Sequence, residues 1–176
     1  MKKSERIKLL AFDVDGTLTP GCLVMGALGE NSKIFHARDG LGLALAHRMG
    51  YITGFITGRR SKIVETRGQE LAADFVLMGV VDKVKAMESL LEKYGLSWEE
   101  AAYMGDDLND LPLLERAVFS ACPKDGVKEV RDAADFVSHF RGGEGAAREL
   151  IEKILKAQHR WKEAVDSYRK VQEIRQ

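Results

Sequence analysis

The run Ile7-Lys8-Leu9-Leu10-Ala11-Phe12, followed at once by Asp13-Val14-Asp15-Gly16-Thr17, decides how the rest of this chain is interpreted. An apolar run of this length is typical of a buried strand, and the glycine after it marks a tight turn. Two carboxylates at the end of a buried strand suit a nucleophile and a neighbouring acid/base that share one divalent cation. A plain polar turn is the alternative, because Asp and Gly are common turn residues.

Three further apolar runs end in polar clusters. Residues 52–56 precede Thr57-Gly58-Arg59-Arg60, residues 75–78 precede Gly79 and then Lys83, and residues 101–104 precede Gly105-Asp106-Asp107-Leu108-Asn109-Asp110. Ligands of open α/β sheets bind at the carboxyl ends of the strands, so we expect these clusters to converge. Together they offer carboxylates, a hydroxyl with backbone amides, and an ammonium group. These are the groups that phosphoryl transfer requires.

Short apolar runs alternate with amphipathic segments along the chain, which predicts an α/β fold with a doubly wound, mostly parallel, Rossmann-like sheet. The expected strands are 7–12, 51–56, 75–78, 101–104, 117–121 and 135–138. The expected helices are 39–49, 60–72, 83–94, 108–116, 125–132 and 143–157. We expect a single domain over residues 1–158, followed by a helical or flexible tail over residues 159–176 that could contact a partner.

An insertion of about residues 19–35 separates the first strand from the first helix. Its glycines and flanking apolar residues predict a β-hairpin that projects from the sheet. The stretch from Thr57 to Lys83 has room for one helix and one strand, so we expect no cap domain on either side. An open site of this kind indicates a large substrate or a lid supplied by a neighbouring subunit. Exposure of an apolar hairpin favours an oligomer.

The composition narrows the function classes. The chain has 176 residues and a formal net charge of zero, so no overall basic charge indicates nucleic acid as a partner. No apolar stretch reaches the length of a membrane span, and we expect no membrane partner. The two cysteines, Cys22 and Cys122, have no metal-binding spacing, and reduced thiols in a cytoplasmic protein are the expectation.

Taken in order and spacing, the four polar clusters resemble the motifs of the haloacid dehalogenase-like phosphatase superfamily. Further segments resemble its capless, hairpin-bearing branch, the 3-deoxy-D-manno-octulosonate 8-phosphate phosphatases. These segments are Leu18-Thr19, Gly29-Glu30, Lys33 with Phe35, Arg38-Asp39-Gly40-Leu41-Gly42, the stretch 57–61, and residues 142–149 with Ala157-Gln158. Pro20 departs from the branch, which usually has an acidic residue there.

The resemblance implies a Mg²⁺-dependent phosphomonoesterase that hydrolyses 3-deoxy-D-manno-octulosonate 8-phosphate through an aspartyl-phosphate. It also implies a role in lipopolysaccharide biosynthesis and a homotetramer in which neighbouring subunits cover each active site. Two alternatives stay open. One is a phosphatase for another sugar acid phosphate, such as a nonulosonate 9-phosphate, and the other is a catalytically silent binding module.

For this chemistry we expect Asp13 to be the nucleophile and Asp15 the acid/base. Mg²⁺ would be held by the carboxylates of Asp13 and Asp106 and by the main-chain carbonyl of Asp15. Lys83 would neutralise the charge on the phosphoryl group. Taken without the other motifs, each residue has a simpler interpretation. Lys83 would be a solvated helix lysine, and Asp106 would belong to a helix N-terminus, where acidic residues are favoured.

The remaining site residues are expected around this centre. Asp107 and Asp110 would lie in the outer shell of the metal, orienting waters or Lys83. The Thr57 hydroxyl and the Gly58 amide would bind phosphate oxygens, although Thr57 could instead cap the following helix. Arg59 would bind the substrate carboxylate, because a guanidinium pairs with a carboxylate through two hydrogen bonds. Arg67, further along the same helix, is a second candidate for substrate binding.

Overall fold

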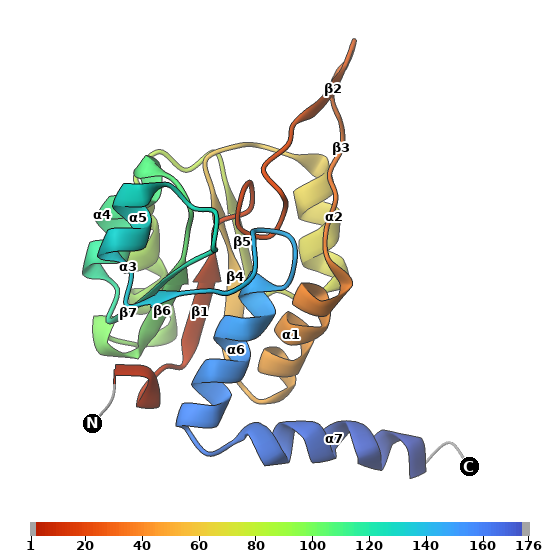
Figure 1. The fold of residues 1–176 in the computed structure, drawn as a ribbon, viewed down its shortest axis with the longest axis vertical. Helices are drawn as coiled ribbons and strands as arrows, with labels where there is room; N and C mark the ends of the chain where they lie inside the picture. The colour runs from red at the N-terminus through yellow and green to blue at the C-terminus, as the bar shows by residue number, and fades with distance from the viewer. Residues whose placement is uncertain (1–2, 174–176) are drawn as a thin grey trace.

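The computed structural model describes residues 3–173, which fold around one parallel β-sheet. Its six strands lie in the order β5-β4-β1-β6-β7-β8 (Figure 1). Their bounds are β1 Leu9–Phe12, β4 Ile52–Thr57, β5 Phe75–Met78, β6 Ala101–Met104, β7 Phe119–Cys122 and β8 Phe136–Val137. All six expected strands form, with ends that shift by up to two residues from the predicted ones.

Strand β1 lies at the point where the chain changes direction across the sheet. From β1 the chain moves outward to β4 and β5, and it then returns to pair β6 with the other edge of β1. Leu9 is therefore in register with Ile52 on one side and with Ala101 on the other. A crevice opens at the carboxyl ends of the strands at such a switch point, and it is the usual ligand site of these sheets.

Helices cover both faces of the sheet. The helices are α1 Ala37–Arg48, α2 Lys62–Glu70, α3 Lys83–Tyr94, α4 Leu111–Arg116, α5 Lys128–Ala133, α6 Ala146–Ala157 and α7 Trp161–Glu173, with 3-10 turns η1 Lys3–Glu5, η2 Trp98–Glu100 and η3 Leu108–Asp110. Leu10 and Phe12 point to the face covered by α1 and α6, whereas Leu9 and Ala11 point to the face covered by α3 and α4. This alternation confirms the predicted doubly wound α/β class.

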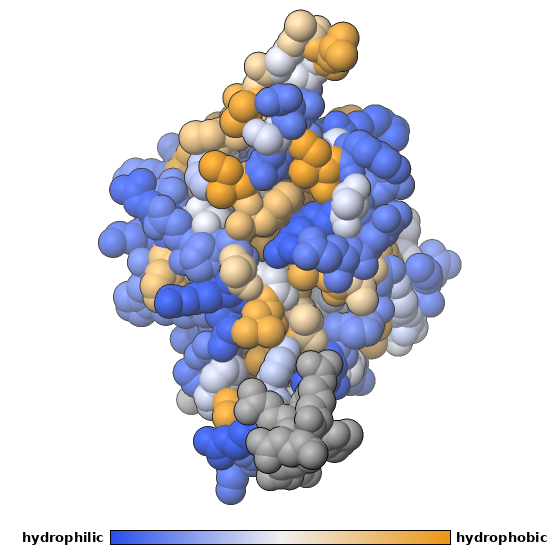
Figure 2. All heavy atoms as spheres, turned by 90° about the vertical axis from the view of Figure 1, so that its right-hand side faces the viewer, coloured by the Kyte–Doolittle hydropathy of each residue, from blue (hydrophilic) through white to orange (hydrophobic). Residues whose placement is uncertain are grey.

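A two-stranded antiparallel hairpin, β2 Val24–Gly26 and β3 Gly29–Ser32, projects from the carboxyl edge of the sheet (Figure 1). The hairpin was expected, and its projecting end is apolar (Figure 2). Between Thr57 and Lys83, where every residue is described, the chain forms only α2 and β5. The expectation that neither connection holds a cap domain is therefore confirmed.

The end of the chain forms helix α7, which crosses the end of α6 (Figure 1). Ala164 is fully buried, and the Arg48 guanidinium of α1 lies 4.3 Å from the centre of the Tyr168 ring. The last three positions of the predicted tail, 174–176, lie outside the described residues. Within residues 3–173, none of the helices has the length and apolar character that a membrane crossing requires.

Candidate active site

Three strand ends bring acidic and basic side chains together at the carboxyl edge of the sheet. Asp13 directly follows β1, Lys83 is the first residue of α3 after β5, and Asp106 lies two residues beyond β6. The Lys83 Nζ atom is 2.6 Å from Asp13 Oδ1 and 2.6 Å from Asp110 Oδ1. Lys83 is 4% exposed, so this charged network lies in the interior of the protein rather than in solvent.

The turn after β1 is shaped to receive Asp106. Gly16 has a φ of +95°, which residues with a side chain rarely adopt, and a Cβ there would collide with the Asp106 carboxylate. The Thr17 hydroxyl donates a hydrogen bond of 2.9 Å to Asp106 Oδ1. The amides of Leu18 and Thr19 both bond the Val14 carbonyl and close the turn. Gly16 and Thr17 therefore allow the acidic loop after β1 to pack against the acidic loop after β6.

Both carboxylate oxygens of Asp110 are occupied by hydrogen bonds that fix Lys83 and the loop after β6. Its Oδ1 accepts hydrogen bonds of 2.6 Å from both Lys83 Nζ and the Tyr103 hydroxyl. Its Oδ2 accepts from the amides of Asp106 and Asp107, at 2.9 and 3.2 Å. Asp107 is exposed, and its carboxylate accepts from the Leu108 amide at the start of η3. The two residues expected in the outer shell of the metal thus have different surroundings.

The carboxylates of Asp13, Asp106 and Asp110 lie together, and Asp13 and Asp106 are the two that could hold a divalent cation, because both oxygens of Asp110 already accept hydrogen bonds. Their oxygens lie within 4.8 Å of one another, and hard carboxylate oxygens are the ligands that Mg²⁺ prefers. Burial raises the pKa of Asp13 to about 7 despite the opposing charge of Lys83. Burial and the charge of Asp13 likewise raise the pKa of Asp106 to about 7. Three carboxylates beside one ammonium leave an excess of negative charge, which a cation would neutralise.

A second group of predicted residues lies at the end of β4. Thr57 is 2% exposed, and its carbonyl accepts a hydrogen bond of 3.1 Å from the Val80 amide in the loop before Lys83. Its hydroxyl accepts a 3.4 Å bond from the Arg59 amide. Gly58 is exposed, and a Cβ there would meet only the Val80 carbonyl, at 3.7 Å. Space for a phosphate group therefore remains at this backbone.

Asp15 lies against the hairpin and the β4 loop. Its Oδ1 accepts from Lys33 Nζ, and its Oδ2 is 3.7 Å from Arg59 Nε. The Arg59 side chain is 44% exposed, so it lies between Asp15 and solvent. Sequence reasoning gave Lys33 no role in the site. The only signal was its place in a segment that resembled the branch, because residue spacing does not show which way a hairpin lysine points.

Arg67 is not brought to this centre. Its guanidinium pairs with Glu70 at 2.7 Å and lies 5.5 Å from the centre of the Phe35 ring. A Cβ on Gly40 of α1 would collide with the same guanidinium. These contacts involve residues that follow the hairpin, Phe35 and Gly40. No described contact joins Arg67 to the acidic cluster. Helix α2 turns Arg67 away because it lies nearly two turns after Ser61, which caps the helix.

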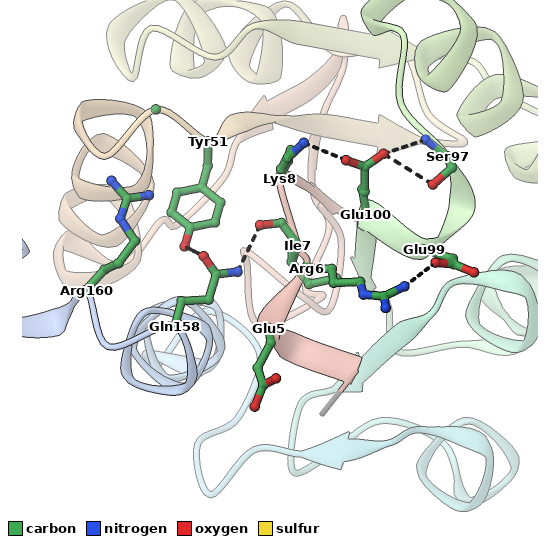
Figure 3. A pocket seen from close by; sticks show the side chains of 11 residues that line it. Glu5, Arg6, Ile7, Lys8, Tyr51, Ser97, Glu99, Glu100, Gln158 and Arg160 are labelled. Atoms are coloured by element: carbon green, nitrogen blue, oxygen red, sulfur yellow. Dashed lines mark hydrogen bonds and ion pairs between the residues drawn. The ribbon is translucent and has the colours of Figure 1, made fainter. Parts of the chain in front are cut away.

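A separate pocket lies at the opposite edge of the sheet, around the residues that precede β1, β4 and β6 (Figure 3). Two ion pairs join residues that line it: Lys8 with Glu100 at 2.7 Å and Arg6 with Glu99 at 2.5 Å. Gln158 accepts from the Tyr51 hydroxyl at 2.5 Å and donates to the Ile7 carbonyl. The pocket therefore ties α6 to the start of the sheet and offers no cluster of reactive groups.

Known proteins share both the sequence and the fold. The profile of the haloacid dehalogenase-like hydrolases matches residues 65–150. The 3-deoxy-D-manno-octulosonate 8-phosphate phosphatase of Salmonella typhi is 40% identical over 164 residues, which are 93% of this chain and 87% of that protein. The Escherichia coli K12 protein of the same name is 40% identical over 162 residues, 92% and 86% of the two chains.

Solved structures of such phosphatases have the same fold as this chain. That of the Moraxella catarrhalis 3-deoxy-D-manno-octulosonate 8-phosphate phosphatase, in complex with magnesium, phosphate and KDO, has a TM-score of 0.91 at 37% identity and covers 94% of this chain and 95% of that one. The cobalt-bound phosphatase of Haemophilus influenzae has a TM-score of 0.88 at 37% identity, with 90% and 93% covered.

Proposed function

The chain belongs to the 3-deoxy-D-manno-octulosonate 8-phosphate phosphatases of the haloacid dehalogenase-like hydrolases. We propose that it hydrolyses this phosphate ester with Asp13 as the nucleophile. The reaction releases the free sugar acid and phosphate, with Mg²⁺ as cofactor. One observation carries the proposal: Asp13 contacts Lys83 and lies beside Asp106 at a buried strand end, in a chain 40% identical to such enzymes over 93% of its length.

Asp13 attacks phosphorus in line and forms an aspartyl-phosphate as the bond to the sugar oxygen breaks. Lys83, 2.6 Å from Asp13 Oδ1, offsets the repulsion between this carboxylate and the anionic phosphoryl group. Mg²⁺ between Asp13, Asp106 and the Asp15 carbonyl would supply further positive charge to the transferring oxygens. Asp110 holds Lys83 and the Asp106 amide in place, through two of the four hydrogen bonds described above.

Asp15 moves the protons. It gives a proton to the departing sugar oxygen, and it later takes one from the water that hydrolyses the aspartyl-phosphate. The chain leaves the strand at Asp13 and turns, with the Val14 carbonyl accepting the Leu18 and Thr19 amides, so the two carboxylates have different partners: Asp13 pairs with Lys83 and Asp15 with Lys33. One carboxylate can therefore face phosphorus while the other faces the leaving group. The Thr57 hydroxyl and the Gly58 amide bind phosphate oxygens, and the exposed Arg59 guanidinium pairs with the substrate carboxylate.

The assembly we propose is a homotetramer in which adjoining subunits cover each site. The hairpin exposes Leu23, Val24, Met25, Leu28 and Ile34, and Leu28 has no contact that reduces its exposure (Figure 2). Exposed apolar side chains gathered on one projecting element are typical of a protein interface. We place the enzyme in the cytoplasm because Cys22 and Cys122 are both unpaired, as expected for a reducing compartment.

Phosphate release with Mg²⁺ over a panel of sugar phosphates tests the activity. The panel contains 3-deoxy-D-manno-octulosonate 8-phosphate, a nonulosonate 9-phosphate and simple hexose phosphates. We expect the octulosonate to be preferred, and turnover to be lost with EDTA and in Asp13→Asn. The matched control is Asp132→Asn, which changes an exposed carboxylate paired with Lys128.

Three outcomes would contradict parts of the proposal. Preference for the nonulosonate would reassign the substrate and keep the chemistry. Substantial turnover by Asp13→Asn would remove Asp13 as the nucleophile. Failure of the wild-type protein to hydrolyse any of these substrates would favour a silent binding module.

A further inference from the structure

Lys33 is a buried lysine whose charge is directed at the acid/base of the proposed reaction. It follows β3 at the base of the hairpin, and its side chain is 1% exposed. Lysine is almost never fully buried without an ionic partner. Here the partners are Asp15 Oδ1 and Glu30 Oε1, the latter at 2.8 Å. Two carboxylates surround the ammonium group, so Lys33 directs its charge at these carboxylates rather than at solvent.

Glu30 links this pair to the rest of the site. Its Oε2 accepts a hydrogen bond from the Ser61 hydroxyl, and that hydroxyl accepts one of 3.2 Å from the Val64 amide. Ser61 is the N-cap of α2, the helix that follows the phosphate-binding residues Thr57 and Gly58. A continuous set of polar contacts therefore runs from the start of α2 through Ser61, Glu30 and Lys33 to Asp15.

The two oxygens of Asp15 differ as a result. Oδ1 is held by Lys33, whereas Oδ2 is buried and has no hydrogen-bond partner among the described residues. A buried carboxylate oxygen without a partner costs free energy, and a catalytic role is one explanation for such an atom in a native structure. Arg59 Nε is the nearest cation described for this oxygen, at 3.7 Å, beyond hydrogen-bond distance.

We propose that Lys33 is a positioning residue for Asp15, holding Oδ1 so that Oδ2 faces the leaving oxygen of the substrate. This inference rests on the proposed function, in which Asp15 is the acid/base. In that step the Oδ2–H bond breaks, its proton goes to the sugar oxygen, and the electron pair of the breaking P–O bond stays with that oxygen. Asp13 forms the new bond to phosphorus.

The consequence concerns the leaving group. A sugar alcohol is a poor leaving group and needs the proton, whereas p-nitrophenolate is stable as an anion and leaves without one. Loss of Lys33 should therefore slow hydrolysis of the sugar phosphate more than that of p-nitrophenyl phosphate. A hairpin anchor with no role in the reaction would affect both substrates alike.

The test compares Lys33→Met with the wild type by kcat/KM, which reports the steps up to departure of the leaving group. Substrates are the octulosonate 8-phosphate, phenyl phosphate and p-nitrophenyl phosphate. General acid catalysis contributes about 100- to 10,000-fold, so we expect kcat/KM to fall at least about tenfold more for the sugar phosphate than for p-nitrophenyl phosphate, with phenyl phosphate between them. Lys62→Met, which removes an 82% exposed lysine from α2, should leave the ratios unchanged.

Equal losses on all three substrates would overturn the proposal and make Lys33 a structural anchor. A rise in KM confined to the sugar acid would also overturn it, because that result indicates direct contact with the substrate. If Lys33→Met does not fold, Glu30→Gln keeps the lysine and loosens its support. A smaller shift in the same ratio supports positioning, and an unchanged ratio overturns it. A wild-type protein inactive on every substrate would overturn the proposed function, and this inference with it.

Discussion

Asp107 and Asp110 are three positions apart, yet a single 3-10 turn gives them opposite environments. Asp107 is exposed and caps that turn, whereas Asp110 is fully buried and accepts four hydrogen bonds. An amide at position 110 would present donors to Lys83, to Tyr103 or to the backbone amides, which are all donors themselves. The turn therefore makes one aspartate replaceable and the other not.

We expect Asp110→Asn to lower the free energy of unfolding by about 3 kcal/mol, because it leaves part of a buried charged network without a partner. Asp107→Asn should cost less than about 1 kcal/mol, since asparagine caps a helix as well as aspartate does. Urea unfolding with Mg²⁺ present measures both, because the cation offsets the repulsion between the remaining carboxylates. Equal stability of the two variants would contradict this account of Asp110.

Asp13 and Asp106 make metal-free stability depend on pH. Their pKa values are raised from 3.8 to about 7 in the folded protein, so between these values the folded state binds more protons than the unfolded state. The free energy of unfolding of the metal-free protein therefore falls, through these groups, as the pH rises toward 7. The cation binds the deprotonated carboxylates, so its stabilising effect should grow over the same range.

Thermal melts with EDTA and with Mg²⁺ at about pH 5.5 and about pH 8 test this dependence. The rise in Tm caused by Mg²⁺ should be clearly larger at the higher pH. Asp106→Asn should abolish most of the rise at both pH values. A rise of the same size at the two pH values would show that these carboxylates do not control metal binding.

At the scale of the elements, the strands were predictable because each apolar run is ended by polar residues. Asp13, Thr57 and Asp106 each follow such a run, and parallel pairing then brings the strand ends to one edge of the sheet. Neither the pairing partners of Lys33 nor the direction of Arg67 could be predicted in this way. Both depend on how the hairpin root and α2 pack together, which is set by contacts distant in sequence.

The helix boundaries show a similar limit. The helix expected over 108–116 begins instead as the 3-10 turn η3 and becomes α-helical only at Leu111. Pro112 is compatible with the first turn of a helix but not with its interior, which explains why α4 begins there. The tight turn before it is what lets Asp110 reach back to the amide of Asp106. The start of α4 therefore differs from the predicted one because of the local geometry of this loop, which the hydrophobic pattern does not show.

The hairpin β2–β3 is the element we expect to hold the assembly together. Met25 is 57% exposed and Leu28 fully exposed at its projecting end, whereas its base is fixed by the buried Lys33. In the double variant Met25→Asp with Leu28→Asp, four desolvated carboxylates would have to meet for each pair of hairpins, so the assembly should dissociate. The fold of each chain should persist, because neither side chain contributes to the core.

Light scattering after size exclusion measures the mass, and circular dichroism measures the fold. We expect the double variant to have the mass of a single chain with a wild-type spectrum. Val137→Asp introduces a carboxylate at an exposed apolar position of β8, outside the hairpin, and should keep the wild-type mass. An unchanged mass in the double variant would mean that the hairpin does not mediate assembly.

For the molecule as a whole, the positions of the residues indicate what one chain supplies and what the proposed assembly would add. Asp13, Lys83 and Asp106 lie together within one chain, and Asp15, two residues after Asp13, pairs with Lys33 of the same chain. The rim of the site, by contrast, is open and partly apolar: Val81 is fully exposed, as is more than half of Leu108. In the proposed assembly the chemistry would therefore need one subunit, whereas recognition of a large sugar acid would need a cover from a neighbouring one.

Dilution of the enzyme should separate the chemical step from recognition of the sugar acid. As the protein concentration falls below that at which the assembly dissociates, we expect kcat/KM for the octulosonate 8-phosphate to fall at least about tenfold, because an uncovered site loses part of its substrate-positioning contacts. Hydrolysis of p-nitrophenyl phosphate, which needs only the phosphate-binding residues and the cluster around Asp13, should fall much less. The hairpin variant should show the diluted behaviour at every concentration. If both activities fell in parallel, the neighbouring subunit would be required for the chemistry itself, and a site complete within one chain would be ruled out.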